Sequence, residues 1–95
     1  MITQILKKPI IEDWSAYSLL SFEDKQVFNS ATANGELLGV DYIAQEVAIK
    51  TSTGTNYRFK CDAFLVSTEK TQWEAIIEIF KPLTGRPYIT GITKL

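Results

Sequence analysis

The alternation of apolar and polar positions is clearest between residues 46 and 66 of this 95-residue chain. Val47 and Ile49 alternate with charged or small residues, and the stretch 56–62 alternates aromatic or small apolar residues with polar ones. A period of two residues, rich in β-branched and aromatic side chains, is typical of half-buried strands. The pattern therefore predicts a β-hairpin over residues 46–66.

The turn of this hairpin follows from the requirement that apolar residues of the two strands share one face. A three-residue loop, Ser52-Thr53-Gly54, meets that requirement. It predicts a type I turn followed by a bulge, with a positive φ at Gly54, where glycine has the least steric cost. The expected cross-strand pairs are Val47 with Phe59, Ile49 with Tyr57, and Glu46 with Lys60.

Residues 68–81 show the spacing of an amphipathic helix. Four apolar side chains fall at positions i, i+3, i+4 and i+7, which form one stripe on a helix. Thr71 and Glu74 have the spacing of a capping box, and Pro82 cannot continue a helix. The sequence therefore predicts a helix over residues 68–81. The stripe consists of Trp73, Ile76, Ile77 and Phe80.

The stretch 10–34 is open to two interpretations. Its apolar residues have helical spacing, and Ser21 stands three residues before an aspartate, as in a capping box. These features predict one helix broken near Ser21 or two short helices. Asn34-Gly35 is a suitable helix stop. The alternative is a strand through Tyr17–Phe22 that turns directly afterwards.

Three other stretches have the character of strands: residues 2–7, 37–50 and 86–94. The second needs a break near Ala44-Gln45, because its apolar positions change parity there. The third contains Gly91 between apolar residues of different parity, which indicates a bulge or a close backbone approach. Residues 63–66 are apolar on both faces, which predicts a central place in the sheet for the strand 55–66.

In chain order these elements give an α+β domain of ferredoxin-like βαββαβ type, spanning residues 1–95 as a single domain. An antiparallel sheet would carry two helices on one face, with a right-handed βαβ crossover at the C-terminal end. The alternative is a small β-barrel or β-roll with one C-terminal helix. The expected order is β (2–7), α (10–34), β (37–50), β (55–66), α (69–81) and β (86–94).

Composition bears on the core of the protein, its cellular compartment and its distribution of charge. Hydrophobic residues make up 45% of the chain, enough for a core without disulfides, and the one cysteine gives no sign of an oxidising compartment. No apolar run reaches the roughly 18 residues of a membrane span, and the N-terminus lacks the apolar segment of a signal peptide, so a cytoplasmic protein is expected. Residues 1–47 hold three bases and seven acids (−4), whereas residues 48–95 hold seven bases and four acids (+3).

The chain has no histidine, which removes the commonest general base, the commonest zinc ligand and every Ser-His or Cys-His pair. Cys61, on the inward side of a strand, is expected to be a buried apolar residue. The acidic pairs Glu12-Asp13 and Glu23-Asp24 fit the first turns of helices. We therefore expect no enzyme activity, no cofactor and no metal site.

By elimination, the sequence favours a small non-enzymatic protein-binding module: a regulator, an adaptor or a subunit. A sheet edge could pair with a partner protein of unknown identity or with a second copy in a homodimer, or a sheet face could dock a partner. An alternative is single-stranded nucleic-acid binding through the basic strand 56–62; a further one is a small-ligand binder or an enzyme without histidine chemistry. The expected partner-binding residues are Lys50, Arg58, Lys60 and Arg86.

Overall fold

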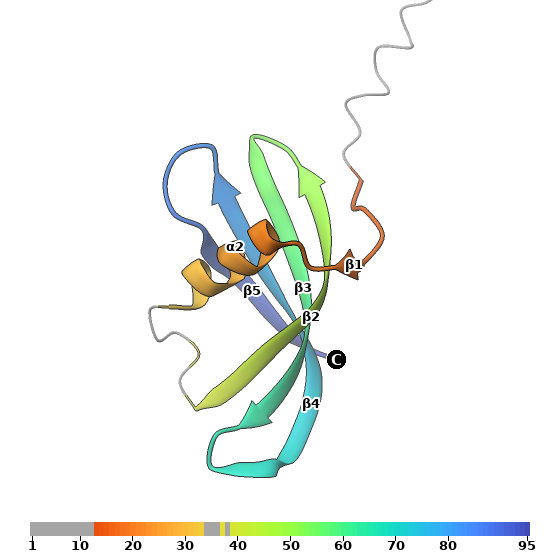
Figure 1. Cartoon of the computed structure of the whole chain (residues 1–95), viewed down its shortest axis with the longest axis vertical. Helices are drawn as coiled ribbons and strands as arrows, with labels where there is room; N and C mark the ends of the chain where they lie inside the picture. The colour runs from red at the N-terminus through yellow and green to blue at the C-terminus, as the bar shows by residue number, and fades with distance from the viewer. Residues whose placement is uncertain (1–12, 34–36, 38) are drawn as a thin grey trace, which may run out of the picture.

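The computed structural model describes residues 13–33, 37 and 39–95 of the chain, and an antiparallel sheet dominates it (Figure 1). In sequence order the strands pair as β1-β2-β3-β4-β5, so each strand lies beside its neighbours in the chain. The elements are β1 (Ser18–Leu19), α2 (Phe22–Thr32), β2 (Val40–Thr51), β3 (Gly54–Leu65), β4 (Thr68–Pro82) and β5 (Tyr88–Lys94).

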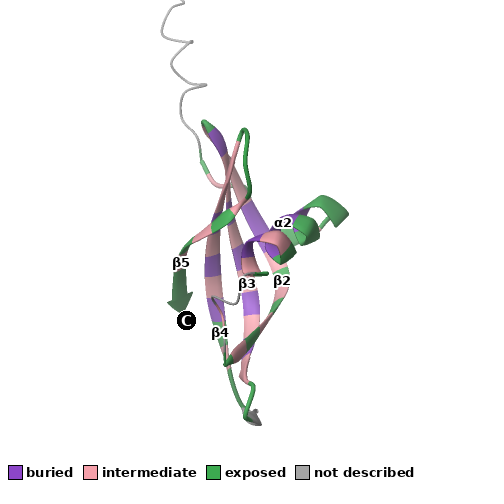
Figure 2. Cartoon of the chain, turned by 90° about the vertical axis from the view of Figure 1, so that its left-hand side faces the viewer, coloured by how far each residue is buried: buried purple, intermediate pink, exposed green. Residues whose placement is uncertain are grey.

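The ferredoxin-like prediction is wrong. Residues 68–81 form strand β4 instead of a helix, and β4 and β5 are adjacent antiparallel strands, so no βαβ crossover joins them. Helix α2 lies across one face of the sheet and precedes the four long strands (Figures 1 and 2). The alternative fold with a single C-terminal helix is therefore also wrong in the position of its helix.

Strand β4 buries alternate residues. Ala75, Ile77 and Ile79 are almost completely buried, and the residues between them lie on the opposite face. β-branched side chains lose rotamer freedom in a helix and pack well on a pleated sheet, and β4 contains three isoleucines. The helical stripe was misleading because Trp73 and Ile77 lie four residues apart, a spacing that puts two side chains on one face of either a helix or a strand.

The β2–β3 hairpin forms in the predicted register. Val47 pairs with Phe59, Ile49 with Tyr57, and Glu46 with Lys60. The register shifts between Ala44 and Glu46, which confirms the predicted break near Ala44-Gln45 as a bulge. Strand β3 occupies the centre of the five-stranded sheet, as its two apolar faces predict.

Gly54 is required for a different reason from the one predicted. Positive φ angles occur at Gly39 and Gly85, whereas Gly54 does not have one. A Cβ atom at Gly54 would lie 2.5 Å from the carbonyl oxygen of Lys81 and 2.7 Å from the ring of Phe80. Strands β3 and β4 therefore approach so closely here that only glycine fits.

Strand β5 contains the predicted bulge. Glu78 pairs with Gly91 and Ile79 pairs with Ile89, which leaves Thr90 as the extra residue. The bulge explains why Ile89 and Ile92, although of different parity, lie on the same face of the sheet.

The stretch 10–34 combines both of its interpretations. Ser18–Leu19 form the short strand β1, and the helix begins after Ser21. The capping box is confirmed, because the Asp24 amide donates to Ser21 Oγ at 3.1 Å and the Ser21 amide donates to Asp24 Oδ2 at 2.9 Å. The predicted strand 2–7 and the helix stop Asn34-Gly35 lie outside the described residues.

The core lies between α2 and the sheet. Val27, Phe28 and Ala31 of α2 are buried against the middle of β3 and β4, where the buried residues of Figure 2 gather. Phe28 meets Phe59 edge-on, with ring centroids 5.0 Å apart. Because Phe59 is fully buried at the centre of β3, it links the helix to both neighbouring strands.

Candidate functional site

Three of the predicted partner-binding residues lie on the sheet face opposite α2, and a tryptophan lies over two of them. The guanidinium carbon of Arg58 is 4.0 Å from the centroid of the Trp14 ring, and Lys50 Nζ is 5.7 Å from it. Arg58 Nε also donates to Glu78 Oε2 at 2.8 Å. Both partners of this ion pair are more than a third exposed, so it contributes about 1 kcal/mol or less.

The segment before β1 positions this tryptophan. The Ser15 amide donates to the Ile49 carbonyl at 2.9 Å, and the Ile49 amide donates to Ser15 Oγ at 2.9 Å. Beyond it, Ser18 and Leu19 pair with β2, and Lys60 Nζ lies 5.7 Å from the centroid of the Tyr17 ring. The segment therefore runs along the outer edge of β2.

Sequence reasoning missed Trp14 and Tyr17 as residues of this face. It treated their spacing as helical, and no local pattern places them next to bases more than thirty residues away in the chain. Lys50, Arg58 and Lys60 share one face as their strand parity requires. Arg86 does not join them, because it is exposed in the loop between β4 and β5.

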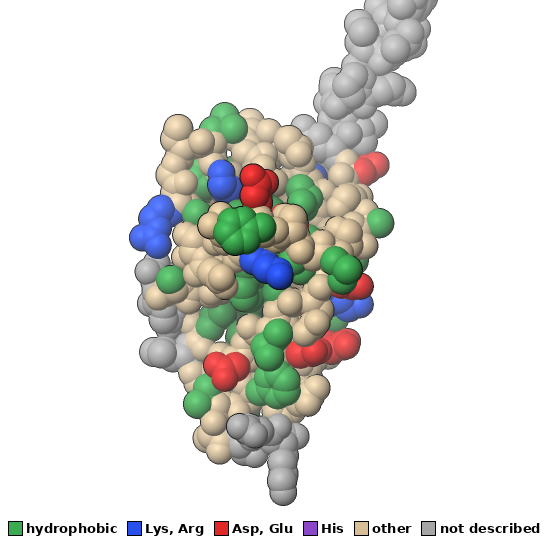
Figure 3. Space-filling view, in the orientation of Figure 1, with side chains coloured by type: hydrophobic (Ala, Val, Ile, Leu, Met, Phe, Trp, Pro, Cys, Tyr) green, Lys and Arg blue, Asp and Glu red, His purple; other side chains and the backbone are tan. Residues whose placement is uncertain are grey.

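The charges on this face are mixed. The register places Glu46 opposite Lys60 and Asp62 opposite Glu74. These four side chains help to line a shallow hollow of about 290 Å³. Figure 3 shows the α2 side of the molecule, where basic and acidic side chains are also scattered among each other. A phosphate backbone needs an excess of positive charge, which neither face offers in its described part.

The outer edge of β5 is a second candidate surface. β5 pairs with β4, and within the described part of the chain no strand pairs with its other side. The Leu95 amide donates to the Glu74 carbonyl of β4 at 2.8 Å. Because amides alternate in direction along an extended strand, those of Ile92 and Lys94 point away from β4. Ile92 is 45% exposed and Leu95 is 60% exposed, so this edge is also apolar.

Cys61 lies in the core, as its parity predicts. Its side chain is 1% exposed, and the thiol donates to the Phe59 carbonyl oxygen at 3.5 Å. Burial, together with the nearby negative charge of Asp62, raises the pKa of the Cys61 thiol to about 12. The thiolate that a nucleophile needs is therefore strongly disfavoured at neutral pH.

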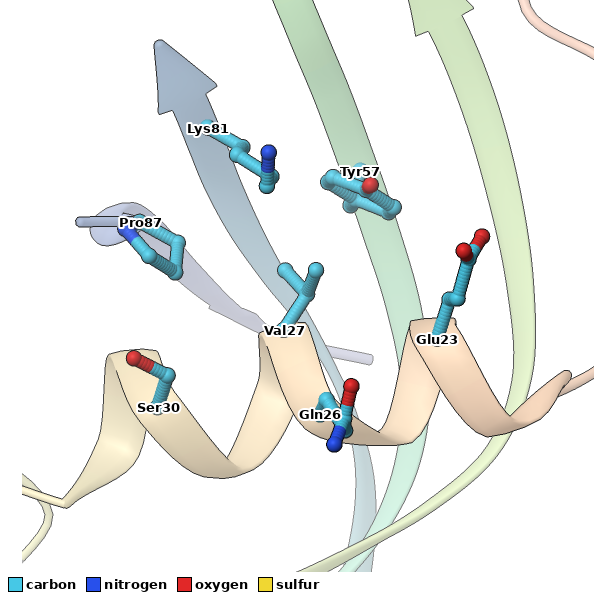
Figure 4. A pocket seen from close by; sticks show the side chains of 7 residues that line it. All are labelled: Glu23, Gln26, Val27, Ser30, Tyr57, Lys81 and Pro87. Atoms are coloured by element: carbon cyan, nitrogen blue, oxygen red, sulfur yellow. The ribbon is translucent and has the colours of Figure 1, made fainter. Parts of the chain in front are cut away.

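A pocket of about 340 Å³ lies between α2 and the sheet (Figure 4). Glu23 and Ser30 line it from the helix, and Tyr57 and Lys81 line it from β3 and β4. Val27 lies between these walls. Burial raises the pKa of the Tyr57 hydroxyl, and the carboxylates of Asp24 and Glu23 raise it further. The pocket thus combines an acid, a base, two hydroxyls and an apolar floor.

Among the described residues, no group of three or more His, Cys, Asp or Glu side chains is arranged to hold a metal ion. Nor does that part of the chain contain a helix of the length and apolarity needed to cross a membrane. No known protein family, curated protein or solved structure matches this chain.

Proposed function

We propose that this protein is a small non-enzymatic protein-binding module that associates through the outer edge of β5, with a second copy of the chain as its partner. The observation that carries the proposal is a strand edge with two outward amides, those of Ile92 and Lys94, and one exposed apolar side chain on each face, Ile92 on one and Leu95 on the other. An exposed strand edge of this kind is a template for an added strand.

The edge is complementary to itself. The bulge at Thr90 interrupts the ladder, so residues 91–95 form its regular part. A two-fold axis at Thr93 would place Ile92 of each copy opposite Lys94 of the other. Each of these two pairs exchanges two backbone hydrogen bonds, because all four residues direct their amides and carbonyls outward. The same register places Leu95 over Gly91 of the second copy, where the missing side chain leaves room for it.

Two properties of the chain support a non-enzymatic role. It contains no histidine, and its one thiol is buried with a pKa raised to about 12. Mixed charges also favour a protein partner over single-stranded nucleic acid, because Glu46, Asp62 and Glu74 lie among the bases of the strand 56–62.

Sedimentation equilibrium of the wild type and two variants tests the proposal. Ile92→Pro removes one outward amide, and an edge strand tolerates proline on its solvent side. Ile92→Val keeps the amide and the branched side chain and is the matched control. We expect a dimer for the wild type and Ile92→Val, and a folded monomer for Ile92→Pro.

Two outcomes would overturn the proposal. A wild type that stays monomeric over the whole concentration range excludes the second copy as partner. In that case, a host protein captured by Ile92→Val but not by Ile92→Pro would be the partner of this edge. A dimer that persists in Ile92→Pro places the interface elsewhere. If Ile92→Pro does not fold by circular dichroism, Lys94→Pro removes the other outward amide, with Lys94→Ala as its control.

A further inference from the structure

The pocket under α2 presents charges of both signs to one small volume. Glu23 belongs to the first turn of α2, whereas Lys81 lies near the end of β4, so the two charges come from opposite walls. Within the part of the chain that the structure describes, no ion pair joins them. In Figure 4 the Tyr57 ring lies between these two side chains, above Val27.

This arrangement is selective by charge. A simple anion held at Lys81 would share the pocket with the Glu23 carboxylate, and a simple cation held at Glu23 would share it with the Lys81 ammonium. In either case a like charge opposes binding. A ligand that carries both charges meets an opposite charge at each end, and its second charge offsets the repulsion from the like charge on the far wall.

The size and the apolar surface of the pocket limit the rest of the ligand. A volume of about 340 Å³ is small for a ligand site, since such pockets span roughly 300–1,000 Å³. Val27 and Pro87 supply apolar contact, and the buried ring of Tyr57 directs its hydroxyl to the same space. A short carbon chain between the two charged groups matches this lining.

We infer that this pocket binds a small zwitterion of the amino-acid class, with its amine at Glu23, its carboxylate at Lys81 and its carbon chain over Val27 and Tyr57. The Tyr57 hydroxyl oxygen accepts a hydrogen bond from the amine end. The inference goes beyond strand pairing at β5 and does not depend on it. Because Glu23 is exposed, the affinity is modest, with a Kd on the order of 1 mM.

A titration of the full, isotope-labelled chain followed by amide chemical shifts tests the inference. The probe is 4-aminobutanoate, and butanoate and butylamine each carry one of its two charges. We expect saturable shifts at Glu23, Val27, Tyr57 and Lys81 with the zwitterion, and binding about tenfold weaker or more for either half. The twenty L-amino acids at the same concentration extend the probe set.

Variants connect the binding to the two walls. Lys81→Gln and Glu23→Gln each weaken 4-aminobutanoate binding about tenfold, and Tyr57→Phe weakens it about fivefold. Lys25→Gln, on α2 but outside the pocket, leaves it unchanged and is the matched control.

The inference is overturned if neither 4-aminobutanoate nor any amino acid gives saturable shifts at these residues. It is equally overturned if butanoate or butylamine binds as well as the zwitterion, or if Lys81→Gln has no more effect than Lys25→Gln. None of these results bears on dimer formation at β5, so failure of the two proposals can be distinguished.

Discussion

Gly54→Ala tests the close approach of β3 and β4 at the β2–β3 turn. The added Cβ would lie 2.5 Å from the Lys81 carbonyl oxygen, about 0.9 Å nearer than the 3.4 Å at which ordinary contact begins. Because that oxygen belongs to the backbone, a strand must shift. Overpacking of this kind costs about 1–3 kcal/mol, and the entropy that alanine saves in the unfolded chain returns about 0.4–1 kcal/mol.

The expected net loss is therefore about 1–2 kcal/mol, or a fall in Tm of about 5–15 °C for a domain of this size. Urea denaturation with unchanged m-value would measure it. At protein concentrations low enough to keep the chain monomeric, Gly91→Ala is the matched control, because its Cβ would lie 3.5 Å from the nearest atom, a Glu78 carboxylate oxygen. A Gly54→Ala protein as stable as Gly91→Ala would refute the steric explanation.

Other predictions follow from single side chains. Ile77→Val should cost about 0.5–1.5 kcal/mol in urea denaturation and Ile76→Val less, because only Ile77 is fully buried in a strand, whereas a helix would bury both. Equal losses would contradict the strand. Ser21→Ala removes the helix cap and should cost about 0.5–2 kcal/mol by the same assay, and an unchanged midpoint would contradict that role. Cys61 keeps its proton in the folded state up to a pKa of about 12 but loses it near pH 9 when unfolded, so its contribution to stability should fall as pH rises from 9 to 12. Cys61→Ala should flatten that decline, and an identical pH profile for both proteins would count against the raised pKa.

Local signals in the sequence predicted several elements of this fold but not its class. The hairpin register followed from period-two alternation, the bulge at Gln45 from a change of parity, and the start of α2 from Ser21 and Asp24. Each of these signals depends on residues close in the chain or across one short turn.

The error at residues 68–81 has a physical cause. Trp73 and Ile77 belong to the apolar set of both periods, whereas Ala75 and Ile79 fit only the strand and Ile76 and Phe80 fit only the helix. Pairing with β3 favours the strand, because without β4 the backbone N–H and C=O groups along that edge of β3 would have no hydrogen-bond partners. That pairing is a tertiary effect, which periodicity within one segment does not contain.

In the candidate sites, too, local sequence signals predicted some features, whereas others depend on tertiary structure. Strand parity correctly placed Lys50, Arg58 and Lys60 on one face, but the course of residues 13–19 decides that Trp14 lies over that face. The pocket beneath α2 likewise joins residues 23 and 81, which no local pattern connects.

Disulfide cross-linking of a Thr93→Cys variant tests strand pairing at β5 most directly. In the proposed register Thr93 opposes its own copy in a non-hydrogen-bonded pair, where Cα atoms lie about 4.5 Å apart, within the range of about 4.4–6.8 Å that a disulfide spans. The native Cys61 is buried, and Thr53→Cys in the β2–β3 turn is the control. Mild oxidation should convert Thr93→Cys almost completely to a covalent dimer and leave Thr53→Cys monomeric; a Thr93→Cys protein that cross-links no faster than Thr53→Cys would contradict pairing at this edge.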